Sequence, residues 1–146
     1  MSEFTVEISW QHAPRAGHPD DYARAHQWHL AGGQTVRASA APEYAGDPDH
    51  TNPEEGLIAA VSSCHMLTFL AVAAKRGFKV TRYTDKASGT LGKNADGRLA
   101  VTEIVLRPQI GFEGQAPGAD ELDRLHASAH RNCFIGNSLT TTVRVE

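Results

Sequence analysis

Two cysteines, Cys64 and Cys133, are the residues of this chain best suited to nucleophilic or redox chemistry. A cysteine reacts as its thiolate, which forms at neutral pH when a nearby cation or helix dipole lowers the thiol pKa. Cys64 lies in Ser62-Ser63-Cys64-His65-Met66, and Cys133 follows His130-Arg131-Asn132. Free cysteine is also among the most buried residue types and often serves as a small apolar side chain. The residue types alone therefore leave both a reactive and an inert role open.

A metal site is an alternative use of the second cysteine. His126, His130 and Cys133 share one face of a predicted helix, and histidines four residues apart bind metal in many proteins. Histidines at this spacing more often line a solvent-exposed helix side. A metal-binding function predicts stoichiometric zinc in the purified protein.

Composition excludes several other classes. The 146 residues suit one domain spanning 1–146, with 40% hydrophobic and 21% charged residues, as in a globular protein. The net charge of −3 argues against binding to nucleic acid or to an anionic membrane. Two cysteines are too few for a disulfide scaffold. Met1-Ser2-Glu3-Phe4 has no signal-peptide character, so we expect a cytoplasmic protein with reduced thiols.

Known motifs for other chemistry do not occur. The chain has no Gly-x-Ser-x-Gly elbow, which disfavours a hydrolase, and no glycine-rich nucleotide-binding signature. A non-catalytic protein that binds a hydrophobic ligand along the apolar central helix remains a further alternative.

The central element is a helix predicted over residues 53–76. Asn52 can cap it, Pro53 suits its first position, and Glu54 and Glu55 favour the positive end of the helix dipole. Residues 57–74 carry no formal charge, which predicts a helix buried on all sides. Its Ser and Ala content and its polar flanks argue against a membrane span.

Strands and a second helix surround this element. Alternation predicts a strand at 4–8 with one face buried, and breakers predict a long loop at 11–25. Pro108 indicates an edge or a bulge. The further predicted elements are a hairpin of 26–30 and 34–38, a loop at 41–51, two long strands at 79–91 and 98–112 joined by a turn, a helix from Asp120 to about residue 132 with Leu122, Leu125 and Ala129 on one stripe, a helical turn at 134–139 and a strand at 140–145.

This order predicts an α+β fold in which antiparallel strands pack around the long central helix. One small sheet cannot cover a helix that is apolar on every side. We therefore expect a homodimer in which two such helices pack together between two sheets.

Three motifs occur in a fixed order: Asn52-Pro53-Glu54-Glu55, Ser62-Ser63-Cys64 and His130-x-x-Cys133-x-x-x-x-Ser138. Together with the order of elements from about residue 4 to the C-terminus, they resemble the OsmC/Ohr family of thiol-dependent peroxidases. The runs from Cys64 to Thr68 and from Tyr22 to His26 look more like a less studied OsmC-like branch. The resemblance implies intertwined α+β homodimers that reduce organic hydroperoxides, and sometimes hydrogen peroxide, without a cofactor.

The resemblance also implies residue roles. Cys64 matches the peroxidatic cysteine and Cys133 the resolving cysteine, and an external thiol or dithiol restores the pair. Glu54 matches the acid that pairs with an arginine beside the thiolate. That arginine comes from the segment between the first two strands, where Arg24 is preferred over Arg15 because it directly precedes a strand. This segment is longer than in the organic-hydroperoxide branch.

The spacing of Glu54 and Cys64 bears on the assembly. Ten helical residues correspond to a rise of about 15 Å, which one arginine cannot easily bridge. Either the helix begins later than Asn52, or Glu54 serves Cys64 of the partner chain. We favour the second arrangement, which makes the dimer part of the active site.

Overall fold

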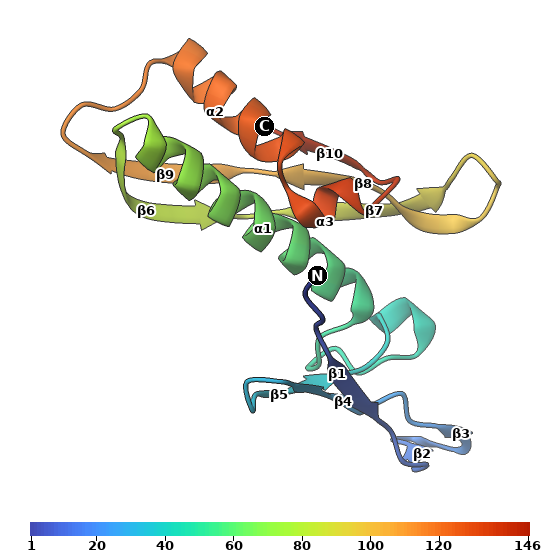
Figure 1. Ribbon diagram of the computed structural model, residues 1–146. Coiled ribbons are helices and arrows are strands. Elements are labelled where there is room, and N and C mark those ends of the chain that lie inside the picture. Colours follow the sequence, from blue (N-terminus) through green and yellow to red (C-terminus); the bar gives the residue numbers. More distant parts are fainter. The chain divides into compact units, whose positions relative to one another are not determined.

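The computed structural model describes residues 1–146 and confirms the α+β class. The chain divides into two compact units, Met1–Gly56 and Leu57–Glu146. Figure 1 labels the elements of both units. The single domain expected over 1–146 stays a prediction.

The N-terminal unit is built on an antiparallel sheet with the strand order β1-β4-β5. Its strands are β1 (Val6–Ser9), β4 (His26–Leu30) and β5 (Thr35–Ala38), and the last two form the predicted hairpin. A short 3₁₀ turn, η1 (Pro42–Tyr44), lies in the segment expected to be a loop.

A second hairpin lies within the segment predicted as a long loop. β2 (Pro14–Arg15) pairs with β3 (His18–Tyr22), and Gly17 between them has a φ of 76°. The prediction of a long loop over 11–25 was wrong at this hairpin: Pro14 and Pro19, two of the residues that suggested a loop, lie in β2 and β3, and only Gly17 lies in the tight turn between them. Glycine adopts this left-handed backbone conformation without a steric penalty.

The two faces of the β1-β4-β5 sheet differ in polarity, as the alternation predicts. Ile8, Trp28 and Val36 are cross-strand partners on one face, whereas Ser9 and Gln27 share the other. All of β1 is exposed within the chain, including Ile8 at 57%. The expected burial of one β1 face therefore does not occur within a single chain.

Helix α1 (Pro53–Lys75) begins where the sequence predicts and ends one residue earlier than expected. Asn52 Oδ1 accepts from the Glu55 backbone N–H at 2.9 Å, and Asn52 Nδ2 donates to Glu55 Oε1 at 2.7 Å. The first of these bonds is an N-terminal helix cap that satisfies the Glu55 N–H, and the second joins the cap side chain to the Glu55 carboxylate. Gly77, with a φ of 82°, follows the helix as the predicted C-terminal glycine.

In the C-terminal unit, a long β-hairpin is broken at matching positions on both arms. β6 (Lys79–Asp85) pairs with β9 (Pro108–Glu113), and β7 (Ser88–Lys93) pairs with β8 (Leu99–Leu106). The prediction of two uninterrupted strands was therefore wrong. The Asp85 carboxylate accepts from the Arg107 backbone N–H at 2.6 Å and from the Ser62 hydroxyl, which replaces ladder bonds at the break. Pro108, which lacks an N–H, begins β9.

The remaining elements complete two apolar clusters around α1. α2 (Ala119–Arg131) and α3 (Phe134–Asn137) follow β9, and β10 (Thr142–Val145) pairs in parallel with β8. One cluster joins Phe69 of α1 to Leu125 of α2, and the other joins Val61 to Ile104 of β8. The predicted stripe on α2 is confirmed, since Leu125 and Ala129 are fully buried.

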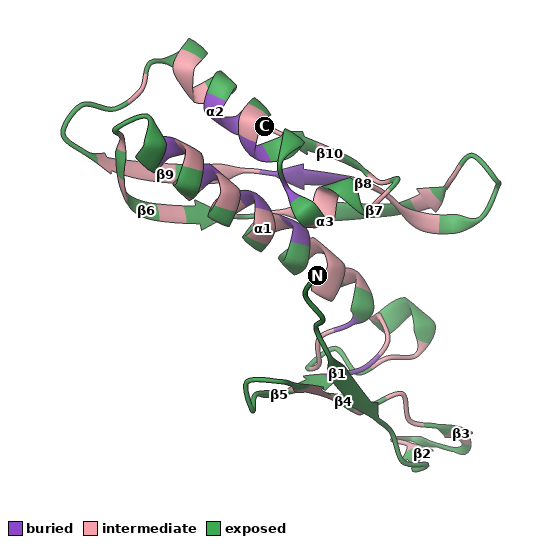
Figure 2. Cartoon of the chain, viewed as in Figure 1, coloured by how far each residue is buried: buried purple, intermediate pink, exposed green.

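Helix α1 is buried along one stripe only. The stripe is formed by Val61, His65, Phe69 and Ala73, one residue in every fourth position, and appears in Figure 2 as purple segments that recur along the helix. Leu67, on another side, is 60% exposed. Within one chain α1 is therefore buried on one side only, and burial on its other sides stays a prediction that depends on the expected dimer. By length and composition α1 could also cross a membrane, a criterion that core helices meet as well.

Candidate functional site

The two cysteines come together in the C-terminal unit although 69 positions separate them in the sequence. Cys64 lies near the middle of α1 and is half-buried, whereas Cys133 lies between α2 and α3 and is only 2% exposed. Both are free thiols. A buried thiol next to a more accessible one is the arrangement in which one cysteine can react with a substrate and the other can then condense with it.

The position of Cys133 is fixed by the helix that follows it. Cys133 is the N-cap of α3, and its Sγ accepts from the Gly136 backbone N–H at 3.4 Å. Burial raises the pKa of the Cys133 thiol, the Gly136 N–H opposes this rise, and the neighbouring Cys64 thiol raises the pKa further. Cys133 is therefore held as a neutral thiol in the reduced protein.

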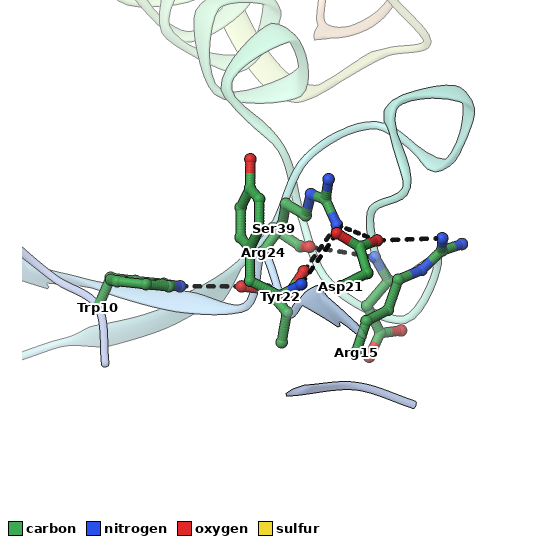
Figure 3. A network of polar contacts seen from close by, with 8 residues as sticks. Trp10, Arg15, Asp21, Tyr22, Arg24 and Ser39 are labelled. Atoms are coloured by element: carbon green, nitrogen blue, oxygen red, sulfur yellow. Dashed lines mark hydrogen bonds and ion pairs between the residues drawn. The ribbon is translucent and has the colours of Figure 1, made fainter. Parts of the chain in front are cut away.

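The two candidate arginines meet at one carboxylate in the N-terminal unit. Asp21 Oδ2 lies 2.6 Å from Arg24 Nη1 and 3.5 Å from Arg15 Nη1. Figure 3 shows both arginines directed at this carboxylate. Arg24 also donates to the Tyr22 carbonyl oxygen at 2.6 Å, and its guanidinium lies 4.0 Å from the centre of the Tyr22 ring. Arg24 lowers the pKa of Asp21, and the carboxylate in turn raises the pKa of Arg24. The arginine is thus charged and oriented.

Sequence reasoning missed Asp21 and Tyr22 as the groups that position Arg24. The signal that could have indicated them is the spacing of Asp21 three residues before Arg24 in Asp-Tyr-Ala-Arg, which permits a local ion pair. Arg15 and Arg24 also line one cleft of about 310 Å³ together with Ser39.

The third candidate residue, Glu54, has no cation beside it in the N-terminal unit. Its Oε2 atom is buried and makes no hydrogen bond. A buried carboxylate oxygen without a partner costs free energy comparable to its lost hydration. Neither Arg15 nor Arg24 pairs with Glu54 in the chain, because Asp21 holds both.

His126, one of the residues considered for a metal site, does not lie on a solvent-exposed side of its helix. His126 is buried rather than solvent-facing, at 9% exposure, and its Nδ1 lies 3.0 Å from Nε2 of the fully buried His65. His126 and His130 form no metal-binding group with Cys133 or with any carboxylate. The His65–His126 hydrogen bond joins α1 to α2, and sequence spacing could not have indicated it because the two residues are 61 positions apart.

Comparison with known proteins agrees with this fold. The family model described as "OsmC-like protein" matches residues 46–146. An OsmC-like protein of unknown function from Vibrio cholerae is 43% identical, with a TM-score of 0.91 over 100% of this chain and 99% of that one. No curated protein matches the chain.

Two more distant solved structures share the fold. The organic hydroperoxide resistance protein OsmC from Legionella pneumophila is 16% identical, with a TM-score of 0.70 over 100% of this chain and 99% of that one. The organic hydroperoxide resistance protein OhrB of Bacillus subtilis is 17% identical, with a TM-score of 0.67 over 98% and 97%. On the family match and the 43% identity, this chain belongs to the OsmC family.

Proposed function

We propose that this protein is a thiol-dependent peroxidase that reduces organic hydroperoxides in a reducing cytoplasm. The observation that carries the proposal is the pair of free cysteines, one half-buried on α1 and the other buried at the start of α3. Two of the solved structures that share the fold are organic hydroperoxide resistance proteins by name. Hydrogen peroxide is a further candidate substrate.

The difference in burial supports the assignment of roles. Cys64 is the more accessible thiol, so we assign it the attack on the peroxide. The Cys64 thiolate bonds to one peroxide oxygen, the O–O bond breaks, and the alkoxide leaves as the alcohol after taking a proton; Cys64 becomes a sulfenic acid.

Cys133 then resolves this intermediate. Its sulfur bonds to the Cys64 sulfur, the hydroxyl of the sulfenic acid leaves as water with the Cys133 proton, and a disulfide forms. An external thiol or dithiol reduces the disulfide by exchange and is itself oxidised to a disulfide. The chemistry uses no cofactor.

Arg24 is the cation that we assign to the Cys64 thiolate, with Arg15 as the alternative. A guanidinium remains charged at any working pH and can hold a thiolate and a carboxylate at once. Glu54 has a buried oxygen without a partner, which supports an arginine contact that forms only in a larger assembly. Within the single chain, Asp21 orients Arg24.

We infer that this larger assembly is a homodimer in which Glu54 of one chain serves Cys64 of the other. Helix α1 begins at Pro53, so the alternative of a later start is removed, and ten helical residues separate Glu54 from Cys64. Exposed apolar side chains on α1 and β1, such as Leu67 and Ile8, supply surface for a second copy.

Thiol titration with cumene hydroperoxide tests the peroxidase function. After one equivalent, both thiols should disappear together as a Cys64–Cys133 disulfide. Cys64→Ser should abolish peroxide consumption, and Cys133→Ser should complete one turnover and then accumulate over-oxidised Cys64. Consumption that continues in Cys64→Ser would refute the assignment.

The assignment of Arg24 and the proposed homodimer are tested by different variants. Arg24→Gln should slow the reaction of Cys64 with peroxide more than Arg15→Gln does, and the reverse order would exchange their roles. Leu67→Glu should give monomers in sedimentation analysis and lose peroxidase activity, whereas Leu99→Glu, at a leucine that is also largely exposed, should do neither. A monomeric variant with full activity would contradict a shared site.

A further inference from the structure

A cleft of about 540 Å³ lies within the N-terminal unit, apart from the residues assigned to peroxide chemistry. This volume suits a small organic molecule. None of the residues that line it is Asp or Glu. They are Ser9, Trp10, Gln11, His12, Ala13, Ala25, His26, Gln27, Arg37 and His50.

A polar row crosses the sheet at this cleft. Ser9 of β1 is the register partner of Gln27 on β4, and Gln27 is the partner of Arg37 on β5. Cross-strand partners project from the same face, and neighbouring strands are about 4.8 Å apart. The row therefore extends about 10 Å across the sheet and brings an amide and a guanidinium side by side.

Some polar groups of the cleft are already satisfied and others are free. Both ring nitrogens of His26 are used, by the Arg24 carbonyl oxygen and by Trp28 Nε1. His50 Nδ1 lies 3.3 Å from Asp47 Oδ2, outside hydrogen-bond geometry. By contrast, the side chains of Gln27 and Arg37 make no hydrogen bond or ion pair within the chain.

Arg37 is a positive charge in a unit whose charged residues are mostly acidic. The segment Met1–Gly56 contains nine acidic residues, three arginines and no lysine. Asp21 pairs with Arg15 and Arg24, so Arg37 is the one arginine of this unit without a carboxylate partner. A guanidinium in a cleft without carboxylates favours an oxyanion, which it can bind through two parallel hydrogen bonds.

One large aromatic side chain, Trp10, also lines the cleft. The indole of Trp10 is fixed by a 2.9 Å bond from Nε1 to the Ala23 carbonyl oxygen, and its ring meets His12 edge to face with centroids 6.2 Å apart. A fixed aromatic ring offers an apolar or aromatic ligand group a surface to pack against.

We propose that this cleft binds a small organic monocarboxylate, with its carboxylate at Arg37 and Gln27 and its apolar or aromatic group against Trp10. The excess of acidic residues in the unit disfavours a dianion, which selects a carboxylate over a phosphate ester. The site is independent of the cysteines and goes beyond the proposed peroxidase function.

Calorimetry and tryptophan fluorescence on the full chain test this site. Phenylacetate is the probe, phenylacetamide its neutral counterpart, and phenyl phosphate and inorganic phosphate the other anions. Trp10 and Trp28 are the only tryptophans, so a Trp28→Phe variant reports on the cleft alone. Cys64→Ser should bind as the wild type does, which separates this test from peroxidase activity.

We expect one phenylacetate per chain and a change in Trp10 emission on binding. Arg37→Gln should weaken binding about tenfold or more through loss of a charge-assisted contact, and phenylacetamide should bind weaker by a similar factor. Gln27→Leu, which leaves the charge in place, should also weaken binding. Arg98→Gln removes the same charge from an exposed turn in the other unit and should have no effect.

Several results would overturn the proposal. These are no saturation by phenylacetate up to about 10 mM, equal losses in Arg37→Gln and Arg98→Gln, or equal binding of phenylacetamide. Tighter binding of phenyl phosphate would show that the site selects phosphate esters and would refute the carboxylate. Inorganic phosphate that binds as tightly as phenylacetate would refute the role of Trp10.

Discussion

The buried His65–His126 pair should make the stability of this protein depend on pH in a defined window. His65 is 1% exposed, and its pKa is lowered from 6.5 to about 4, first by burial and then by the nearby rings of His126 and His130. Burial also lowers the pKa of His126. The charge of Asp85 opposes the lowering of the pKa at both histidines, and the charge of Asp123 opposes it at His126, without reversing it.

Proton binding decides whether acid stabilises or destabilises the folded protein. Between pH 6.5 and about 4 the unfolded chain protonates at position 65 whereas the folded chain does not, so acid favours unfolding. The stability that neutral His65 contributes is fully present above pH 6.5 and is lost as the pH falls to about 4. At 1.36 kcal/mol per pH unit, this window corresponds to a loss of about 3 kcal/mol.

Urea unfolding at pH 7.5 and pH 4.5 measures this loss, at one fixed protein concentration because association alters apparent stability. His65→Gln provides a side chain that can still donate to His126 Nδ1 but cannot titrate. It should lose less stability between the two pH values than the wild type, by about 2–3 kcal/mol. His18→Gln, at an exposed histidine of β3, is the matched control.

Two results would refute this reasoning. One is a pH dependence of His65→Gln that equals that of the wild type. The other is an equal reduction in His18→Gln, which would mean that the loss arises from general charge and not from the buried pair.

Three further changes test the fold. Asn52→Ala removes the side-chain cap of α1 and its two bonds to Glu55, and should lower the free energy of unfolding by about 1 kcal/mol in chemical denaturation, without changing activity per folded molecule. Asp85→Ala leaves the Arg107 N–H without its acceptor and should destabilise by about 1–3 kcal/mol; an unchanged thermal midpoint would mean that the strand break needs no carboxylate. Leu125→Ala in the core should cost about 2–5 kcal/mol, whereas Leu99→Ala, at a leucine that is 66% exposed, should cost much less in the same assay.

The sequence predicted an element correctly where the residues that decide it are close together along the chain, and failed where they are far apart. The start of α1 was predictable because Asn52 and Glu55 satisfy each other three residues apart. The hairpin break was not, because it depends on Asp85 reaching Arg107, 22 positions away. The β2–β3 hairpin was missed because the residues of a tight turn and of an open loop are the same.

By itself the sequence determined the α+β class, the start of the central helix and the identity of the two thiols. These depend on periodicity, caps and residue type, which act within a few positions along the chain. Only the tertiary structure decided that Cys133 is the more buried thiol and lies beside Cys64, that Asp21 holds both candidate arginines, and that His65 is buried against His126. Burial and long-range hydrogen bonding depend on which distant segments pack together, and those contacts set the accessibility and charge of each group.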